Sequence, residues 1–387
     1  MSKRYLVIFL AVSIVLCASC SALPVNPTLE APTVTIAASK ATSLPTSPLT
    51  AVQNTATPVI ATPRMPAPSL SGDQLSPTWS PDGQRIVFVA EDNETGQRSL
   101  YSVDLVSGEL SRITNRQTND ILPQYSPDGK SLLFISQWVS QGTKNIPSTI
   151  MVLDFGSGAI RQLSDGTDYI YEAAWSPDGS RIAFVSNRGG KDRLWVMNAD
   201  GSNSRLLTPD LDGIRSAAWS PNGSHIKVTE WQDGGAYAGI HVIDPRTGSD
   251  QRLTDSGDNI NQAVWSADSR SLYYLSGSSI FAVTPDGMSR EMTLTFPSAI
   301  NDYSISPDGT HIAYSMGSEE DLDLYVSSID GSDLRCYRNP GMDDVFALWS
   351  PDGKSFVFSS FVPHQGPNQL YIIRVDNMIP CISHATN

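Results

Sequence analysis

One phrase recurs seven times in this chain of 387 residues and limits what the chain can fold into. Its clearest copy is Trp175–Ser186, where an aromatic residue and Ser-Pro-Asp-Gly precede a run of β-branched and aromatic residues. The serine of the phrase returns at positions 80, 126, 176, 220, 266, 306 and 350, a period of roughly 40–50 residues. Such a period, with several short strands in each unit, is typical of a ring of repeated sheets.

Each copy of the phrase predicts a β-hairpin corner. Pro177 sets φ for the second turn position, Asp178 can bond local backbone, and Gly179 accepts a positive φ without strain. Ile182 and Phe184 then belong to a second strand, rich in β-branched and aromatic residues. Because the phrase recurs seven times and a catalytic residue is needed once, we interpret its aromatic residue and its aspartate as structural.

A third and a fourth strand follow each corner. In the third unit, Leu194–Met197 leads into a turn of Asn-Ala-Asp-Gly, and Arg205–Thr208 supplies the fourth strand. Each unit is therefore a four-stranded antiparallel blade, which cannot bury both of its faces alone. We predict an all-β fold, a seven-bladed β-propeller over residues 71–387.

The repeat also resembles a known family. The string Trp-Ser-Pro-Asp-Gly-x-x-Ile-x-Phe-x-Ser, followed by a strand, an Asp-Gly turn and Arg-x-Leu-Thr, is similar to the WD40-like repeat of the TolB propeller. Propellers of prolyl-oligopeptidase-type peptidases carry a similar repeat. The resemblance covers roughly residues 72–384 and implies an architecture rather than an activity.

The N-terminus has the features of a bacterial lipoprotein signal. Met1–Arg4 is basic, and Tyr5–Leu16 is an apolar run that is short for a membrane span. Ala18 and Ser19 are small residues before Cys20, which resembles a lipobox and implies lipidation of Cys20 after cleavage. An ordinary cleaved signal and an uncleaved anchor are the alternatives. Residues 1–20 are therefore predicted to be a signal peptide.

Residues 21–70 are rich in Pro, Thr, Ala and Ser, with few charges. Such a segment cannot bury enough apolar surface to fold, so we predict a disordered tether. Signal, tether and propeller together predict an exported, membrane-anchored lipoprotein that faces the periplasm or the cell exterior.

Ring closure and two blades are less regular than the rest. The phrase at Ser266–Ser269 lacks both Pro and Gly, which predicts a looser corner in blade five, and Lys227 places a charge within a strand of blade four. Because Thr62–Pro68 carries too many prolines for a ladder, we expect Ile379–Ser383 to complete blade seven and the first and last blades to meet by packing alone.

Two cysteines lie outside the signal region. Cys336 and Cys381 fall in the predicted outer strands of blades six and seven, which should be farther apart than the roughly 7 Å Cα limit for a disulfide. We expect free thiols, with a disulfide as the alternative if the C-terminal segment leaves blade seven.

Composition and motifs exclude several classes of function. The net charge of −14 leaves no basic stripe for nucleic acid. Neither a G-x-S-x-G elbow nor an H-E-x-x-H motif is present, and the five histidines are scattered along the chain. We therefore predict no catalytic residues, no nucleic-acid partner and no metal centre.

Acidic residues recur where the chain enters each inner strand. These positions should lie around one mouth of the central channel, where converging carboxylates could bind a basic peptide segment or calcium. The alternative is that Asp is simply a turn former there. We expect Tyr169, Tyr171, Arg215 and Phe346 beside them as contact residues. The predicted acidic rim consists of Asp120, Asp168, Glu172, Asp212, Asp258, Asp302, Asp343 and Asp344.

These features predict a non-enzymatic, membrane-tethered propeller that binds a protein or peptide at a channel mouth. The alternative is a glycan-binding or glycan-cleaving propeller at the cell surface, which needs exposed aromatic side chains beside paired carboxylates or a metal. A purely structural envelope module is a third possibility. We expect a monomer.

Overall fold

The structure is a computed structural model, and it describes Arg64, Pro66, Ala67, Leu70 and residues 72–381 except 139–145, 232–236, 256–259, 319–320 and 364. The predicted signal peptide with Cys20, and the predicted tether up to residue 63, lie outside the described residues. Within the described ranges, no helix is long and apolar enough to cross a membrane.

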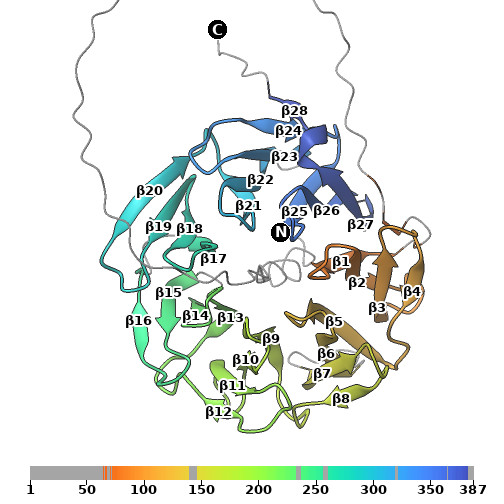
Figure 1. Cartoon of the computed structure of the whole chain (residues 1–387), viewed down its shortest axis with the longest axis vertical. Helices are drawn as coiled ribbons and strands as arrows, with labels where there is room; N and C mark the ends of the chain where they lie inside the picture. The colour runs from red at the N-terminus through yellow and green to blue at the C-terminus, as the bar shows by residue number, and fades with distance from the viewer. Residues whose placement is uncertain are drawn as a thin grey trace, which may run out of the picture.

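Seven antiparallel sheets are arranged around a central axis, and the first strand of each sheet lies innermost (Figure 1). Blades one to three contain β1 (Gln74–Trp79), β2 (Arg85–Glu91), β3 (Arg98–Asp104), β4 (Leu110–Arg112), β5 (Thr118–Tyr125), β6 (Ser131–Trp138), β7 (Ser148–Asp154), β8 (Ile160–Gln162), β9 (Ile170–Trp175), β10 (Arg181–Ser186), β11 (Arg193–Asn198) and β12 (Arg205–Leu206).

Blades four to seven continue the same order. They contain β13 (Ile214–Trp219), β14 (Ile226–Trp231), β15 (Tyr237–Ile243), β16 (Asp250–Arg252), β17 (Ile260–Trp265), β18 (Leu272–Ser276), β19 (Ser279–Val283), β20 (Arg290–Thr295), β21 (Ile300–Ile305), β22 (His311–Ser318), β23 (Asp321–Ser328), β24 (Arg335–Tyr337), β25 (Asp343–Trp349), β26 (Ser355–Val362) and β27 (Gln365–Arg374), then the 3-10 helix η1 (Val375–Asn377) and β28 (Ile379–Pro380).

The predicted all-β, seven-bladed propeller is therefore confirmed. Blades one to five have four strands each, whereas blade six has five and blade seven has three. Seven buried apolar clusters in the described part of the chain lie between neighbouring blades, so the core is a ring of blade-to-blade contacts.

Hydrogen bonds explain why the corner phrase recurs. Ser176 Oγ donates to Asp178 Oδ1 at 2.6 Å and accepts the backbone N–H of Arg181 at 2.9 Å. The same serine-to-acceptor bond forms in all seven corners, with Asn222 as the acceptor in blade four. Serine and aspartate thus close the turn locally, while glycine takes the positive φ, as at Gly179 (φ 70°).

The blade-five corner keeps this turn, contrary to the predicted loosening. Ser269 takes the glycine's place with φ 63°, and Ser266 Oγ still donates to Asp268 Oδ1 at 2.7 Å. Ser269 Oγ also accepts the backbone N–H of Asn222 in blade four at 3.0 Å. This added bond ties the corner to its neighbour and offsets the cost of a non-glycine residue at positive φ.

The corner tryptophans join neighbouring blades. Trp219 Nε1 donates to Ala174 O of blade three at 3.3 Å, and Trp265 Nε1 donates to Ala218 O of blade four at 3.1 Å. Trp79 and Trp349 make the equivalent bond to the preceding inner strand. The indole therefore fills the space between blades and satisfies a buried carbonyl, which supports the structural interpretation of the repeat.

The ring closes through the N-terminal segment, and our prediction of closure by packing alone was wrong. Arg64 pairs with Ile372 of β27 through two backbone hydrogen bonds of 2.9 and 2.8 Å. Asp73 Oδ1 then accepts the N–H of Asn368 at 2.7 Å, and the Gln74 amide bonds Gln369 at 2.7 Å. One backbone bridge and two side chains therefore close the ring, although the prolines prevent a continuous ladder of backbone bonds.

The C-terminal strand joins blade six rather than blade seven. β28 pairs with β24, which makes blade six five-stranded, and Cys381 N donates to Leu334 O at 3.1 Å. This path brings Cys336 and Cys381 to a Cα–Cα distance of 5.5 Å, where they form a disulfide. The expected free thiols were therefore wrong, because the C-terminal segment crosses back to the preceding blade.

Candidate binding site on the loop face

The propeller has two different faces. The corner face carries the seven corners, six of them Ser-x-Asp and one Ser-x-Asn, and the turns between third and outer strands. Backbone bonds such as Leu105 N to Gln84 O at 2.8 Å join the two kinds of turn. The loop face carries the turns between second and third strands and the connections between blades, joined by bonds such as Ser148 N to Asp168 O at 2.9 Å. The seven described residues of the predicted acidic rim belong to this loop face or to the inner strands next to it.

Most of the predicted rim is buried rather than exposed. Asp258 lies outside the described residues, Asp168 is half-buried, and Asp212 is exposed. The remaining five have exposed fractions of 8% or less: Asp120, Glu172, Asp302, Asp343 and Asp344.

Glu172 and Asp302 connect inner strands of successive blades. Glu172 Oε2 accepts the N–H of Ala217 at 2.9 Å, and Asp302 Oδ2 accepts the N–H of Phe346 at 3.0 Å. Gln262 occupies the matching position in blade five, and its Oε1 accepts the N–H of Tyr303 at 3.2 Å. Because an uncharged glutamine makes the same bond, the position needs an acceptor rather than a negative charge.

Glu172 also forms a buried pair with Lys227. Burial raises the pKa of Glu172 to about 8 and lowers the pKa of Lys227, although the charge of each partner favours ionisation of the other. Lys227 Nζ donates to Ser216 Oγ at 3.4 Å. Lys227, the charge within the blade-four strand, is therefore paired with Glu172 of blade three. The amino-acid composition does not predict this contact.

Three further rim acids have partners close by. Asp212 Oδ1 accepts the N–H of Asp192 at 3.0 Å, and Asp343 Oδ1 accepts the N–H of Leu322 at 3.1 Å. Both carboxylates therefore bind the turn or third strand of the preceding blade. Asp120 Oδ1 accepts a hydrogen bond from Ser136 Oγ at 2.7 Å within its own blade.

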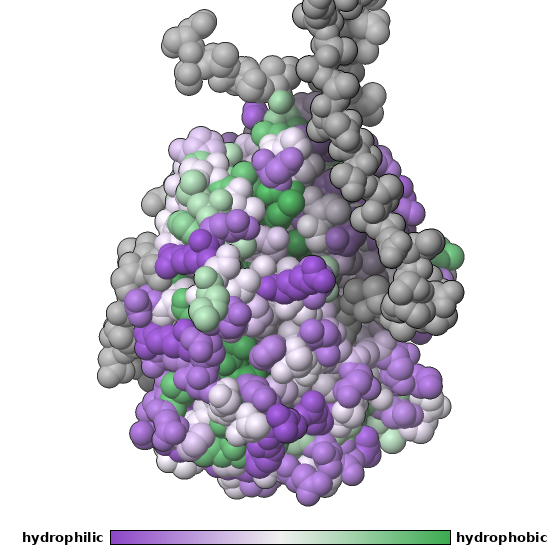
Figure 2. Space-filling model, turned by 60° about the vertical axis from the view of Figure 1, so that its left-hand side comes forward, coloured by the Kyte–Doolittle hydropathy of each residue, from purple (hydrophilic) through white to green (hydrophobic). Residues whose placement is uncertain are grey.

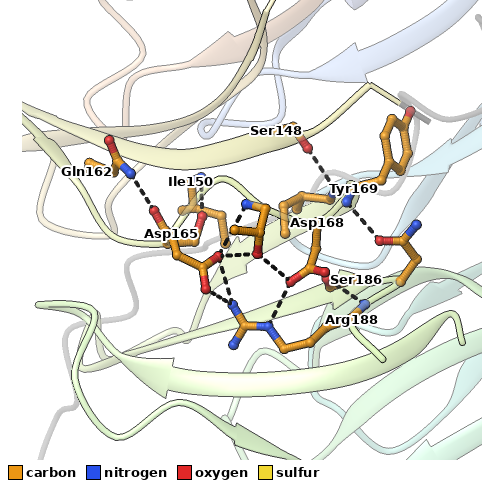
Figure 3. A network of polar contacts seen from close by, with 12 residues as sticks. Ser148, Ile150, Gln162, Asp165, Asp168, Tyr169, Ser186 and Arg188 are labelled. Carbon is orange, nitrogen blue, oxygen red and sulfur yellow. Dashed lines mark hydrogen bonds and ion pairs between the residues drawn. The ribbon is translucent and has the colours of Figure 1, made fainter. Parts of the chain in front are cut away.

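Asp168 belongs to a partly exposed polar network between blades two and three (Figure 3). Arg188 Nε donates to Asp168 Oδ2 at 2.9 Å, and Arg188 Nη2 donates to both oxygens of Asp165 at 3.1 Å. The guanidinium also lies 5.2 Å from the Trp195 ring centroid. These contacts hold the Arg188 guanidinium between two carboxylates near the surface.

A second group of the same kind lies one blade further on. Arg215 pairs with Asp192 and lies 4.3 Å from the Tyr171 ring centroid, and Tyr171 in turn makes an edge contact with Tyr169 at 4.6 Å. Lys191 Nζ lies 3.8 Å from Asp212 Oδ2. The structure thus brings together Asp168, Asp212, Tyr169, Tyr171 and Arg215, whereas Phe346 lies across the ring in β25. The name charged rim is used below for nine residues: Asp165, Asp168, Tyr169, Tyr171, Arg188, Lys191, Asp192, Asp212 and Arg215.

Asp344 differs from the other rim acids that the structure describes. Its exposed fraction is 0%, and neither carboxyl oxygen has a hydrogen bond of normal geometry, although Ser360 and Asn339 lie nearby. Burial first, and then the charges of Asp323 and Asp343, raise the pKa of Asp344 to about 7.

Exposed negative charge gathers on the corner face, which the sequence analysis missed. The aspartates of the corners and of the outer turns accept hydrogen bonds from nearby Ser, Thr or backbone N–H groups, and each has a lowered pKa. They include Asp82, Asp104, Asp128, Asp154, Asp178, Asp200, Asp244, Asp268, Asp286, Asp308, Asp330 and Asp352. This charge could have been predicted from the sequence, because the repeated phrase places an aspartate in nearly every corner.

Metal ligands do not converge in the part of the chain that the structure describes. No three His, Cys, Asp or Glu side chains there are arranged to hold an ion. The geometry of the charged rim instead suits polar and aromatic contact with another molecule.

Comparison with known proteins extends the resemblance seen in the repeat. The family model of the TolB beta propeller domain matches residues 50–148, and that of the dipeptidyl peptidase IV N-terminal region matches residues 126–219. A Tol-Pal system protein TolB from Anaeromyxobacter dehalogenans is 54% identical over 37 residues, which are 10% of this chain and 8% of that protein.

Two solved structures are similar. TolB from Acinetobacter baumannii is 24% identical, with a TM-score of 0.43, and the match covers 67% of this chain and 53% of that one. An oligogalacturonate lyase from Vibrio parahaemolyticus is 13% identical, with a TM-score of 0.62, over 77% of this chain and 88% of that one. The chain thus spans only part of the TolB proteins that it matches. The folded part is thus a seven-bladed β-propeller that is TolB-like in its repeat and in the family model matched by residues 50–148.

Proposed function

We propose that this chain is a propeller of the bacterial cell envelope that binds a protein or peptide partner through its loop face. The charged rim carries the proposal, because it exposes fixed charges of both signs beside aromatic rings, which is the composition of protein-recognition surfaces. The TolB-like fold supports the same class of function.

The disulfide supports export of the protein. Bonds such as Cys336–Cys381 persist in oxidising compartments and are rare in the cytosol. Together with the lipobox-like sequence before Cys20, it supports a lipoprotein tethered to a membrane and facing the periplasm or the cell exterior. Loss of lipid labelling in Cys20→Ala, with labelling retained in Cys17→Ala, is the expected result; equal labelling of wild type and Cys20→Ala would contradict it.

The polar surface of the molecule fits partner binding by charge and hydrogen bonding. Figure 2 shows that the side of the ring on the left of Figure 1 is largely hydrophilic, with apolar residues in small separate patches. The aspartates of the corner face are engaged in turn closure. We therefore place partner binding on the loop face and propose a non-catalytic role.

Site-specific photo-cross-linking tests this function. A cross-linker at Tyr169, on the charged rim, should capture a discrete envelope protein in cells, whereas one at Asp308, on the corner face, should not. Arg188→Ala should weaken capture at Tyr169 without changing the melting temperature by more than a few degrees. Absence of adducts at Tyr169, or the same adducts from both faces, would contradict the proposal.

Glycan binding or cleavage is a second candidate. It is favoured by the similar fold of the oligogalacturonate lyase and by the aromatic and acidic side chains of Tyr169, Tyr171 and Asp168 on one rim. Binding or cleavage of oligogalacturonate that is lost in Tyr171→Ala would establish it in place of a protein partner.

A further inference from the structure

Four aspartates meet on the loop face between blades six and seven. Asp321 and Asp323 begin β23, and Asp343 and Asp344 begin β25. Asp321 Oδ1 accepts the N–H of Gly341 at 3.0 Å, which ties the turn of blade six to the connection that enters blade seven. We call these four residues the Asp344 cluster.

Asp344 is the member of this cluster whose carboxyl group lacks hydrogen-bond partners. It is fully buried, and both carboxyl oxygens lack a hydrogen bond of normal geometry. Ser360, its neighbour across the β25–β26 pair, is also buried with an unsatisfied Oγ. Buried polar groups normally have a hydrogen-bond partner, so the two oxygens of Asp344 are acceptors that nothing within the cluster satisfies.

The electrostatics of the cluster differ from those of the charged rim. Burial raises the pKa of Asp323, and the charge of Asp321 raises it further, although Arg338 Nε lies 3.7 Å from Asp323 Oδ2. In the charged rim, partial burial of Asp165 is outweighed by hydrogen bonds from Thr167 and the charge of Arg188, so its pKa is lowered. Neighbouring carboxylates therefore oppose the ionisation of Asp323 and Asp344, whereas the charge of Arg188 favours the ionisation of Asp165.

We propose that the Asp344 cluster receives a cationic side chain, a lysine ammonium or an arginine guanidinium, from the protein partner of the loop face. This inference rests on the proposed function and names the chemistry that the partner must present. An ammonium or guanidinium supplies several N–H donors and a positive charge, which is what the unsatisfied oxygens of Asp344 lack.

The cluster has a route by which a cation can approach. Asp321 is exposed, and the side chain of Asp323, whose charge acts on Asp344, is 16% exposed, so the cluster meets solvent through these two residues. An arriving cation favours ionisation of Asp344, whose proton leaves to water. Binding therefore strengthens as the pH rises through about 7, the pKa of Asp344 in the unliganded fold.

Calorimetric titration of the full-length chain with an N-acetylated tetralysine peptide tests this inference. Binding should strengthen from pH 6 to pH 8. At pH 8, Asp323→Asn and Asp344→Asn should each weaken it at least about ten-fold, because a charge-assisted bond contributes roughly 1.5–3 kcal/mol. Asp352→Asn on the corner face is the matched control and should stay within about two-fold of wild type.

Three results would overturn the inference. They are unchanged affinity in Asp344→Asn, an equal loss in Asp352→Asn, and calcium that binds alone and is lost in the same variants, which would make the cluster a metal site. Because Asp344→Asn should be at least as stable as wild type at pH 8, melting curves separate lost binding from unfolding. The peptide titration needs no natural partner, so its failure is distinct from failed cross-linking at Tyr169.

Discussion

Removal of the Cys336–Cys381 disulfide should measurably destabilise the propeller. The bond joins residues separated by 45 positions. In the chain-entropy treatment, a loop of this size restricts the unfolded chain by about 13 cal/mol/K, which is about 4 kcal/mol at 25 °C. With an unfolding entropy of about 2.1 cal/mol/K per residue over about 310 folded residues, the expected fall in melting temperature is about 6 °C.

Thermal denaturation with and without reductant measures this effect. Wild type should lose about 6 °C in reductant, whereas Cys336→Ala/Cys381→Ala should have the same melting temperature in both buffers. The chain has four cysteines, and the other two, Cys17 and Cys20, lie outside the described propeller, so no second disulfide within the propeller confuses the comparison. If the bond is present by mass and its reduction leaves melting unchanged, the C-terminal strand does not belong to the cooperative unit and the reasoning fails.

Two other predictions concern buried polar groups. Folding raises the pKa of Asp344 from 3.8 to about 7, so Asp344 ionises more readily in the unfolded chain than in the folded chain. The folded state therefore loses stability as the pH rises from about 4 to 7. Asp344→Asn should therefore stabilise by up to about 4 kcal/mol at pH 8 and by little at pH 4 in urea denaturation; an equal effect at both pH values would contradict the assignment. Trp219→Phe should cost about 1 kcal/mol more than Trp175→Phe, because Trp219 Nε1 bonds Ala174 O whereas Trp175 Nε1 has no partner; equal costs would show that the indole bond contributes nothing.

Local turn chemistry made the blades predictable. Ser176, Pro177, Asp178 and Gly179 act within one hairpin, so their effect can be derived from the phrase alone. The interpretation of the repeated tryptophans as structural followed from their number, although the carbonyls that Trp219 and Trp265 bind belong to the preceding blade.

Ring closure depends on contacts that no local pattern contains. Arg64 and Ile372 meet only because seven blades return the chain to its beginning, and the count of prolines misled us because one residue suffices for the bridge. The estimate of cysteine separation failed for a related reason: it assumed that the last strand stays in its own blade, whereas β28 crosses to blade six.

The candidate site was predictable in residue type but not in role. The described acids lie in the inner strands or just before them, yet whether a carboxylate faces water or a neighbouring N–H depends on packing between blades. Glu172 and Asp302 became acceptors for the next blade, while Asp168 stayed near the surface beside Arg188. Charge counting cannot make this distinction, because Gln262 fills the same place without a charge.

The backbone bridge between Arg64 and Ile372 has a mechanical consequence. Any tension transmitted through the residues before Arg64 enters the molecule at the contact between its first and last sheets. Two backbone bonds at Ile372 and the side chains of Asp73 and Gln74 bear that load first. Pulling on the N-terminus should therefore open the toroid at this junction before any single sheet unravels.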